Sequence, residues 1–454
     1  MKPLDEFLVG WKIKIPAIFI LALAVRLLYL GLFVQSQDLL IEDQGMYVKM
    51  AGLIGDGLWK EIIPDRVLGY PIFLSLIQKT FGNLYLATLM VQGMVDSATC
   101  VLIGLLAQTI LGQGFLGAGL LSALNLNMII LSGMILTDTL ALFFFTASLL
   151  GMAFYFRRGN AGWATLCLGS LAAATAVRPT TYYLYPVIVL ALAGAALVIR
   201  KIPGQSVGIA LAGIFFWALF LGPQHGRNWI QHNYAGYVSQ GGVHLVGWVV
   251  PGVYQYGGLG SYEEGERFAQ ATLKKLLSKD GIQELPSKES LKERYLVAAG
   301  GECLQEMGWG RITRAWITGS VVNLLAPSIA FAPRFRELKS ASFYYTPGKN
   351  LAEKLTNYIR SGASTFYLAG LAVGTICSAA LLGLAGLGYY RVLRQSHSPE
   401  MHGLCVLMLL VFGYFLLITG PVVGTKYRLP IEPILIALGT AGILTRKKSN
   451  QGGL

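Results

Sequence analysis

Three aspartates at the edges of apolar segments are well placed for chemistry: Asp43, Asp65 and Asp138. A carboxylate beside a membrane surface can take the proton of a hydroxyl group as a general base, or it can bind a divalent cation. Asp43 and Asp138 also have a structural alternative, because each precedes a helical run and aspartate is favoured at the start of helices. For Asp65 the alternative is a solvated turn. The sequence leaves these alternatives open.

The loop that holds Asp43 and Asp65 is long for a connection between membrane helices. It runs from Ile41 to Pro71, about thirty residues, where a helical hairpin needs only a few. Residues 43–54 predict a short helix, because apolar residues recur there at helical spacing. The run Gly69-Tyr70-Pro71 predicts a break before the next element. We expect this loop to be catalytic, with a solvated connector as the alternative.

A set of basic residues and their neighbours is suited to hold a phosphate group at the membrane surface. Arginine forks and lysine ammonium groups bind phosphate oxygens well. The candidates are Arg66, Tyr70, Arg178, Arg227, Asn228, Lys426 and Arg428. For the charged members, snorkelling to the phosphates of ordinary lipids is the alternative.

Signals for cofactors are few. The five cysteines show no metal or redox spacing, and the five histidines read as ordinary loop residues, with His225 and His232 kept as candidates for a metal or sugar contact. The sequence leaves open whether the three aspartates bind a divalent cation. It shows no P-loop and no dinucleotide fingerprint. Arg26 lies within the first apolar segment, where an arginine normally pairs, and the sequence does not reveal its partner.

The composition is that of a membrane protein. Of the 454 residues, 54% are hydrophobic and only 13% are charged, whereas roughly a quarter of a soluble domain is charged. The formal charge of +13 does not indicate nucleic-acid binding, because the basic residues cluster at the ends of apolar segments, where anionic lipid is the fitting partner. About ten segments can cross a hydrocarbon layer of ~30 Å. They are Ile15–Val34, Leu84–Leu111, Phe115–Leu131, Ile135–Phe156, Trp163–Val177, Tyr183–Ile199, Val207–Leu221, Phe366–Tyr390, Leu404–Thr419 and Leu429–Leu444.

The basic loops predict the orientation of these segments. With the N-terminus in the cytoplasm, four basic clusters fall on the cytoplasmic side, as the positive-inside rule requires. The clusters are Arg157-Arg158, Arg200-Lys201, Arg391 with Arg394, and Arg446-Lys447-Lys448. The three aspartates and the candidate phosphate-binding residues then share the opposite face. We therefore predict a multi-pass protein of the inner membrane whose active site faces the periplasm or the outside.

Three regions follow from this topology. Residues 1–222 form an N-terminal transmembrane module with the catalytic loop at 35–83, residues 223–365 form an outer-face segment with amphipathic helices, and residues 366–454 hold the C-terminal transmembrane helices. Ser261 to Gln305 predicts one or two amphipathic helices with a break near Asp280-Gly281. Residues 310–331 are apolar enough to span, but a further crossing would reverse every later basic loop, so we expect a helix at the interface.

The order of several short motifs resembles a known group of enzymes. The motifs are IEDQGMY and DRVLGYP in the first outer loop, LTDTL, AVRP, GRNW, and the late TKYRLPIEPILIALG. They are similar to those of GT-C glycosyltransferases that use a polyprenyl-phosphate-linked sugar, the class of the protein O-mannosyltransferases and the lipid A aminoarabinose transferase (families 39 and 83). The resemblance implies an all-α polytopic membrane protein with a GT-C helical bundle of about ten spans.

The resemblance also implies roles for particular residues. Asp43 would lie next to the acceptor, Asp65 and Arg66 would form an acid–base pair, and Asp138 would be a further acid. The carrier phosphate would lie against the basic residues Arg227 and Arg428, with Arg178 and Lys426 beside them. The partners implied are a polyprenyl-phosphate-linked sugar and a lipid, polysaccharide or protein acceptor, within membrane lipid. The alternatives are a transporter or flippase of lipid-linked glycans, and a polymerase or ligase that shares the carrier.

Overall fold

A computed structural model describes residues 12–35, 43–82, 85–339, 342–348 and 350–444, and within these ranges the chain is helical without strands. Six of the helices in these described ranges are long and apolar enough to cross a membrane. The protein is therefore an all-α polytopic membrane protein, as the sequence predicts. Glu42 and the Arg446 cluster lie outside the described residues.

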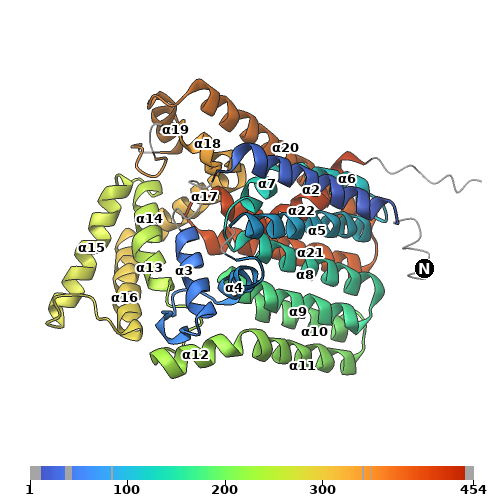
Figure 1. The fold of residues 1–454 in the computed structure, drawn as a ribbon, viewed down its shortest axis with the longest axis horizontal. Helices are drawn as coiled ribbons and strands as arrows, with labels where there is room; N and C mark the ends of the chain where they lie inside the picture. Colours follow the sequence, from blue (N-terminus) through green and yellow to red (C-terminus); the bar gives the residue numbers. More distant parts are fainter. Residues whose placement is uncertain (1–11, 36–42, 83–84, 340–341, 349, 445–454) are drawn as a thin grey trace, which may run out of the picture.

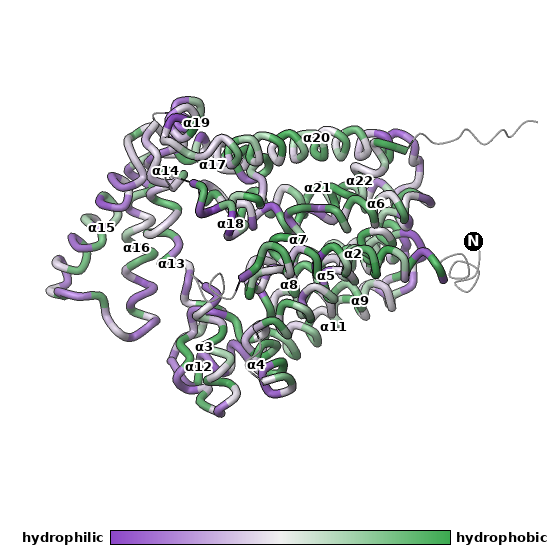
Figure 2. The backbone as a smooth tube through the Cα atoms, turned by 45° about the horizontal axis from the view of Figure 1, so that its top comes forward, coloured by the Kyte–Doolittle hydropathy of each residue, from purple (hydrophilic) through white to green (hydrophobic). Residues whose placement is uncertain are grey.

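The spanning helices run side by side and form the apolar part of the molecule (Figures 1 and 2). They are α2 (Lys14–Phe33), α5 (Tyr85–Leu111), α8 (Asp138–Arg158), α11 (Pro203–Phe220), α20 (Thr365–Gln395) and α21 (Pro399–Thr419). A seventh span results if α6 (Phe115–Ala123) and α7 (Leu126–Ser132), bent by 52° at their junction, count as one. The helices α9 (Ala161–Val177) and α10 (Leu184–Val198) are apolar but shorter.

Each of the ten predicted segments contains a helix, but the last is shorter than the sequence suggests. Its α-helix, α22, covers only Glu432–Ile443, and the residues before it form the 3-10 helix η6 (Thr425–Ile431). Pro430 and Pro433 explain the late start, because a proline lacks the N–H that a helix interior needs and is tolerated in the first turn.

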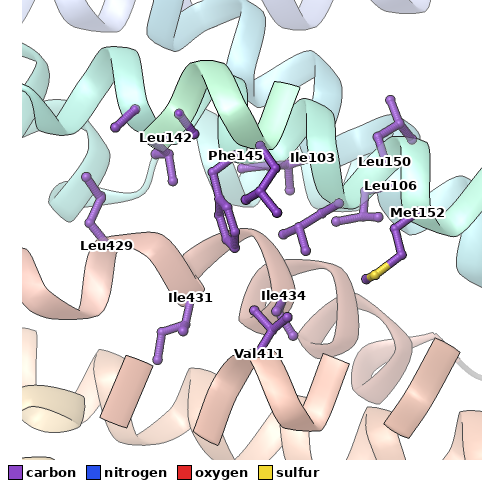
Figure 3. Close-up of a cluster of buried hydrophobic side chains, with 14 of the residues drawn as sticks. Ile103, Leu106, Leu142, Phe145, Leu150, Met152, Val411, Leu429, Ile431 and Ile434 are labelled. Carbon is purple, nitrogen blue, oxygen red and sulfur yellow. The ribbon is translucent and has the colours of Figure 1, made fainter. Parts of the chain in front are cut away.

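The core of the bundle lies where α5 and α8 meet α21 and α22. Figure 3 shows Phe145 and Leu142 facing Leu429, Ile431 and Ile434 across this junction. Close packing of α22 on α20 depends on small residues, as is common between membrane helices. A Cβ added to Gly388 of α20 would lie 1.8 Å from the carbonyl oxygen of Leu438.

Arg26 is the buried charge whose partner the sequence left unnamed. Its Nε donates to Asp96 Oδ2 of α5 at 2.8 Å, and its Nη1 donates to the carbonyl of Ala123 at 2.5 Å. Ala123 is the last residue of α6, so Arg26 also binds a free carbonyl at the bend between α6 and α7. The arginine thereby joins three helices inside the membrane.

Arginines also bind helix carboxyl ends at one end of the bundle. Arg157 donates to the carbonyl of Thr109 at 2.9 Å, Arg200 to Phe156 at 2.6 Å, and Arg391 to Gly442 at 2.6 Å. The last carbonyls of a helix lack intrahelical partners and carry partial negative charge, so these contacts are favourable. Three of the basic clusters used to predict the orientation thus lie where helices end together.

The polar region lies at the other end of the bundle (Figures 1 and 2). It contains α3 (Asp43–Gly55), η2 (Trp59–Glu61), α4 (Gly69–Phe81), η3 (Pro179–Thr181), α12 (Gly222–His232), α13 (Gly241–His244), the π-helix η4 (Leu245–Val249), α14 (Val250–Tyr256), α15 (Tyr262–Lys279), α16 (Glu289–Met307), α17 (Trp309–Leu325), η5 (Ser328–Phe331), α18 (Pro333–Arg336) and α19 (Leu351–Arg360). Two helices, α15 and α16, occupy the predicted amphipathic stretch, and they have a buried core of their own with α14. The helix α17 covers most of the predicted interfacial stretch 310–331, and it is not among the described helices that are long and apolar enough to cross a membrane.

Candidate functional site

The first outer loop supplies an open cluster of charges together with η6. Arg66 lies 3.6 Å from Asp43 and 3.5 Å from Asp65, and Lys426 lies 3.8 Å from Asp43. These separations exceed hydrogen-bond lengths, so the attraction is electrostatic and leaves room for a ligand. The side chains of Asp43, Arg66 and Lys426 are 42%, 18% and 23% exposed. We call Asp43, Arg66 and Lys426 the open cluster.

A second, tighter pair lies at the start of α8. Arg178 Nη1 donates to Asp138 Oδ2 at 2.6 Å and to the hydroxyl of Thr137 at 2.9 Å. Asp138 is the first residue of α8 and Thr137 is its N-cap, so Asp138 is not the cap. Arg178 directly follows α9, whose last carbonyls face the same region. The pair therefore connects the ends of two membrane helices.

Tyr47 lies between the two charged groups. It is buried on α3, and its ring packs edge-on against Tyr70 with centroids 5.3 Å apart. Burial raises the pKa of the Tyr47 hydroxyl, and the charges of Arg178 and Arg66 oppose that rise. Tyr47 therefore lies within electrostatic range of both arginines.

An apolar pocket begins at the Asp138–Arg178 pair. Its other lining residues include Leu142 and Phe145 of α8 and Phe415 of α21, and its cavity volume is small, about 20 Å³. The pocket is charged at one end and apolar along the rest. Such a shape suits a ligand that has an ionic head and a hydrocarbon tail.

Two residues of the outer segment join the open cluster although the sequence did not single them out for the site. The Gln240 amide oxygen, oriented by its donor neighbours, accepts from Arg66 Nη2 at 2.9 Å and from His244 Nε2 at 3.1 Å. Burial, together with the nearby charges of Arg66 and Lys426, lowers the pKa of His244 to about 4. His244 is therefore neutral at physiological pH. Its one sequence signal was its place among three histidines in the outer segment.

Two predicted ligand contacts have structural roles instead. Tyr70 is fully buried, and its hydroxyl donates to Gln92 Oε1 at 2.5 Å. Asn228 is also fully buried, and its amide donates to the carbonyls of Gly236 and Tyr237 at 2.9 Å each. Both side chains hold the protein's own segments together, so we correct their assignment as substrate contacts.

Arg428, predicted to bind the carrier phosphate, is instead paired inside the protein. Its Nε lies 2.9 Å from Glu432 Oε1, with side chains only 2% and 0% exposed. Glu432 also accepts from Asn127 at 2.5 Å and from Asn125 at 3.1 Å. Both carboxylate oxygens of Glu432 therefore have partners. The sequence analysis did not single out this residue, which is the glutamate of the run IEP.

Arg227, the other predicted phosphate ligand, supports the first outer loop. Its Nη2 donates to the carbonyl of Ile62 at 2.8 Å. Its Nε and Nη1 are buried and have no hydrogen-bond partner in the described structure. Burial lowers the pKa of Arg227, and the nearby Asp65 opposes this effect. The residue lies beside the loop and not in the open cluster.

The remaining candidates concern metals and histidines. In the described ranges, no group of three or more His, Cys, Asp or Glu side chains is placed to hold a metal ion. His225 stacks on Trp217 and bonds the Tyr182 hydroxyl at 3.1 Å. His232 lies beside Arg227, and burial lowers its pKa. Neither histidine reaches the open cluster.

Comparisons with known proteins found a weak structural similarity and no sequence match. No protein-family model matches the chain, and no curated protein sequence matches it. Among solved structures, it is similar to the crystal structure of ArnT from Cupriavidus metallidurans bound to undecaprenyl phosphate, with 12% identity, 96% of this chain and 78% of that chain covered, and a TM-score of 0.32. At this level of similarity, the function must be argued from the site itself.

Proposed function

We propose that this protein is a GT-C type glycosyltransferase that transfers a sugar from a polyprenyl-phosphate carrier to an acceptor at the outer face of the membrane. The observation that carries the proposal is the placement of the open cluster beside an apolar pocket whose charged end is Asp138–Arg178. A lipid-linked sugar phosphate has an anionic head and a hydrocarbon tail that match these two parts. A water-soluble nucleotide sugar would leave the apolar pocket unused.

In this proposal the carrier phosphate lies against Arg66 and Lys426. Both are partly exposed, and the nearest carboxylate oxygens lie 3.5 to 3.8 Å away, so these ion pairs leave room for a phosphate oxygen. Arg178 marks where the head meets the apolar pocket, and the pocket must widen to take the first units of the chain. Arg428 takes no part in binding the carrier phosphate, because Glu432 already neutralises its charge.

Asp43 is the proposed general base. Its exposed carboxylate takes the proton of the acceptor hydroxyl, whose oxygen attacks the anomeric carbon while the bond from that carbon to the phosphate oxygen breaks. The electron pair of that bond leaves with the polyprenyl phosphate, where Arg66 and Lys426 stabilise the added charge. Attack opposite the leaving group inverts the anomeric centre.

The test is transfer of a radiolabelled sugar from polyprenyl phosphate by the purified protein, with isolated membranes as acceptor. Asp43→Asn should lower the rate by roughly 10²–10⁴ and leave carrier binding intact. Asparagine keeps the size and polarity of Asp43, the first residue of α3, so the helix should lose no more than the roughly 0.3–1 kcal/mol of a negative charge at its N-terminus. Asp56→Asn, an exposed position at the other end of α3, is the matched control. Unchanged transfer by Asp43→Asn would move the base to Asp65 or Asp138.

A further inference from the structure

The direction of the Arg66 guanidinium is not fixed by its acidic neighbours. The carboxylates of Asp43 and Asp65 lie 3.6 and 3.5 Å away, which is attraction without a directed hydrogen bond, and Arg66 Nη1 donates to the main-chain carbonyl of Asp65 at 3.1 Å. An arginine fork binds a phosphate well only when its N–H groups point at the phosphate oxygens. Nη1 has this one main-chain partner, so a further group is needed to orient Nη2 if Arg66 serves a phosphate.

Gln240 is the partner that orients the guanidinium. With the Gln240 amide oriented so that its oxygen faces the surrounding donors, that oxygen lies 2.9 Å from Arg66 Nη2 and also contacts Nη1, closer than either carboxylate. His244 donates to the same oxygen from Nε2 at 3.1 Å. The neutral imidazole can make this donation without adding a further positive charge beside Arg66 and Lys426. His244 thus holds the Gln240 amide from one side, and the amide holds Arg66 on the other.

Gln224 fixes the main chain of the same arginine. Its Nε2 donates to the carbonyl of Arg66 at 3.2 Å, from the buried face of α12. Two neighbouring contacts act in the same way: the Ser239 N–H donates to the Pro64 carbonyl at 2.7 Å, and Arg227 donates to the Ile62 carbonyl. Three alternate carbonyls of the loop are therefore bound from the stretch 224–239.

The residues that follow α12 fold back onto this helix. Asn228 binds the carbonyls of Gly236 and Tyr237, and its own oxygen lies 3.4 Å from Gln224 Nε2. Tyr237 stacks on Tyr182 at 4.8 Å, which fastens the stretch to the membrane bundle. The glutamines therefore project from a fixed support and not from a free loop.

We propose that Gln224 and Gln240 are positioning residues for Arg66: Gln224 sets its main chain and Gln240 keeps its guanidinium away from Asp43. The inference rests on the proposed function, in which Arg66 binds the carrier phosphate and Asp43 must stay free to act as a base. A neutral amide suits this task, because it accepts from the guanidinium without cancelling its charge. A carboxylate at the same place would compete with the phosphate.

The test compares binding of a long-chain polyprenyl phosphate with binding of the matching neutral polyprenol, by native mass spectrometry of the full chain in nanodiscs. Gln240→Met should weaken phosphate binding about tenfold, the loss expected for one hydrogen bond to a charged group, and leave polyprenol binding unchanged. Gln224→Met should act in the same direction. Gln240→Glu should also lose phosphate binding, although its carboxylate holds Arg66 in place.

A matched control is Gln205→Met at the opposite end of the bundle, where Gln205 likewise donates to a carbonyl, that of Gly159, at 2.8 Å. It should keep the preference for phosphate. If Gln205→Met and Gln240→Met each weaken the binding of polyprenyl phosphate and of polyprenol by the same factor, the role of Gln240 is merely structural and the inference is overturned. Equal phosphate binding by wild type and Gln240→Met overturns it as well.

The outcome for the wild-type protein separates this inference from the proposed function. No preference for the phosphate over the polyprenol would remove the proposed function together with the reason for positioning Arg66. A preference that survives Gln240→Met and Gln224→Met would remove the positioning role alone. A structure of the Gln240→Met variant gives an independent measurement: the Arg66–Asp43 separation should shorten from 3.6 Å to hydrogen-bond length.

Discussion

At the scale of residues, exposure and spacing separate the charges that can meet a ligand from those that hold the fold. Arg428 and Glu432 are in contact and buried, whereas Lys426, two residues earlier, is partly exposed and 3.8 Å from Asp43. The sequence shows three charges in one short stretch and cannot tell them apart. Burial decides, because a buried charge is tolerated only when a partner neutralises it.

Alanine substitutions should make this difference measurable. Arg428→Ala leaves Glu432 buried and without its cation, which should cost about 3 kcal/mol in the free energy of unfolding. Lys426→Ala should change stability by less than about 0.5 kcal/mol and weaken polyprenyl phosphate binding. Thermal unfolding in detergent and the binding assay together measure both effects. A stable Arg428→Ala protein that loses phosphate binding would return Arg428 to the phosphate site.

Lys354 is a buried cation without an acidic partner in its contacts. Its Nζ donates to the carbonyls of Tyr344 and Thr346 at 3.0 and 3.1 Å, and it lies 4.8 Å from the centre of the Phe343 ring. The Tyr344 hydroxyl in turn donates to the carbonyl of Val423, shortly before Lys426. Lys354 therefore helps to fasten the segment that carries one residue of the open cluster.

The stability of the protein should depend on pH through Lys354. Burial lowers the pKa of Lys354 from its ordinary 10.5 to about 7, so between these values the unfolded chain binds more protons than the folded one. The free energy of unfolding should therefore rise with pH in this window, by roughly 1 kcal/mol per pH unit, and stay level below pH 7. The measurement is the melting temperature from pH 6 to 10, relative to Lys354→Met. Parallel curves for the two proteins would contradict the assignment.

At the scale of elements, the site depends on how closely α4 approaches α9. Gly69 begins α4, and a Cβ there would lie 2.4 Å from the carbonyl oxygen of Ala176, near the end of α9. Arg66 precedes this contact by three residues, and Arg178 follows Ala176 by two. The glycine therefore sets the distance between the two segments that carry the arginines.

Gly69→Ala should push α4 away from α9 and disturb the site. The added methyl meets backbone, which cannot move aside as a flexible side chain could, so we expect a cost of about 1–3 kcal/mol and a loss of transfer. Gly52→Ala in α3 is the control, because a Cβ there meets nothing within 4 Å. It should stabilise its helix by roughly 0.5–1 kcal/mol. Equal melting temperatures for the two variants would show that the close approach is not required.

Sequence periodicity and composition predicted the elements better than the site. The membrane helices, the short helix after Asp43 and the pair α15 and α16 follow from apolar spacing and breaks, which are local signals. Contacts between distant segments carry no such signal. The pairing of Arg26 with Asp96 and the contact of Gln240 with Arg66 join residues far apart in sequence, and burial of Tyr70 and Asn228 depends on that packing. The sequence therefore supplied candidates for the site, but it could not show which of them come together.

At the scale of the whole molecule, the charged groups are divided between the two ends of the bundle. In α8, Asp138 is the first residue and Arg158 the last, about 30 Å apart at 1.5 Å per residue. The carboxyl ends of α5, α8 and α22 bind Arg157, Arg200 and Arg391 at one end. The open cluster and the polar helices lie at the other end. This separation is what the positive-inside argument requires.

The topology is tested with reporter fusions on the two sides of α11, which is one candidate span between Lys201 and Gly236. A fusion after Lys201 should report the cytoplasm, because Arg200 belongs to the end that holds the basic clusters. A fusion after Gly236 should report the outside, because this stretch supports the loop that carries Arg66. The same side for both fusions would mean that α11 does not cross. Opposite sides in the reverse sense would place the open cluster in the cytoplasm, where an outer-face transferase cannot work.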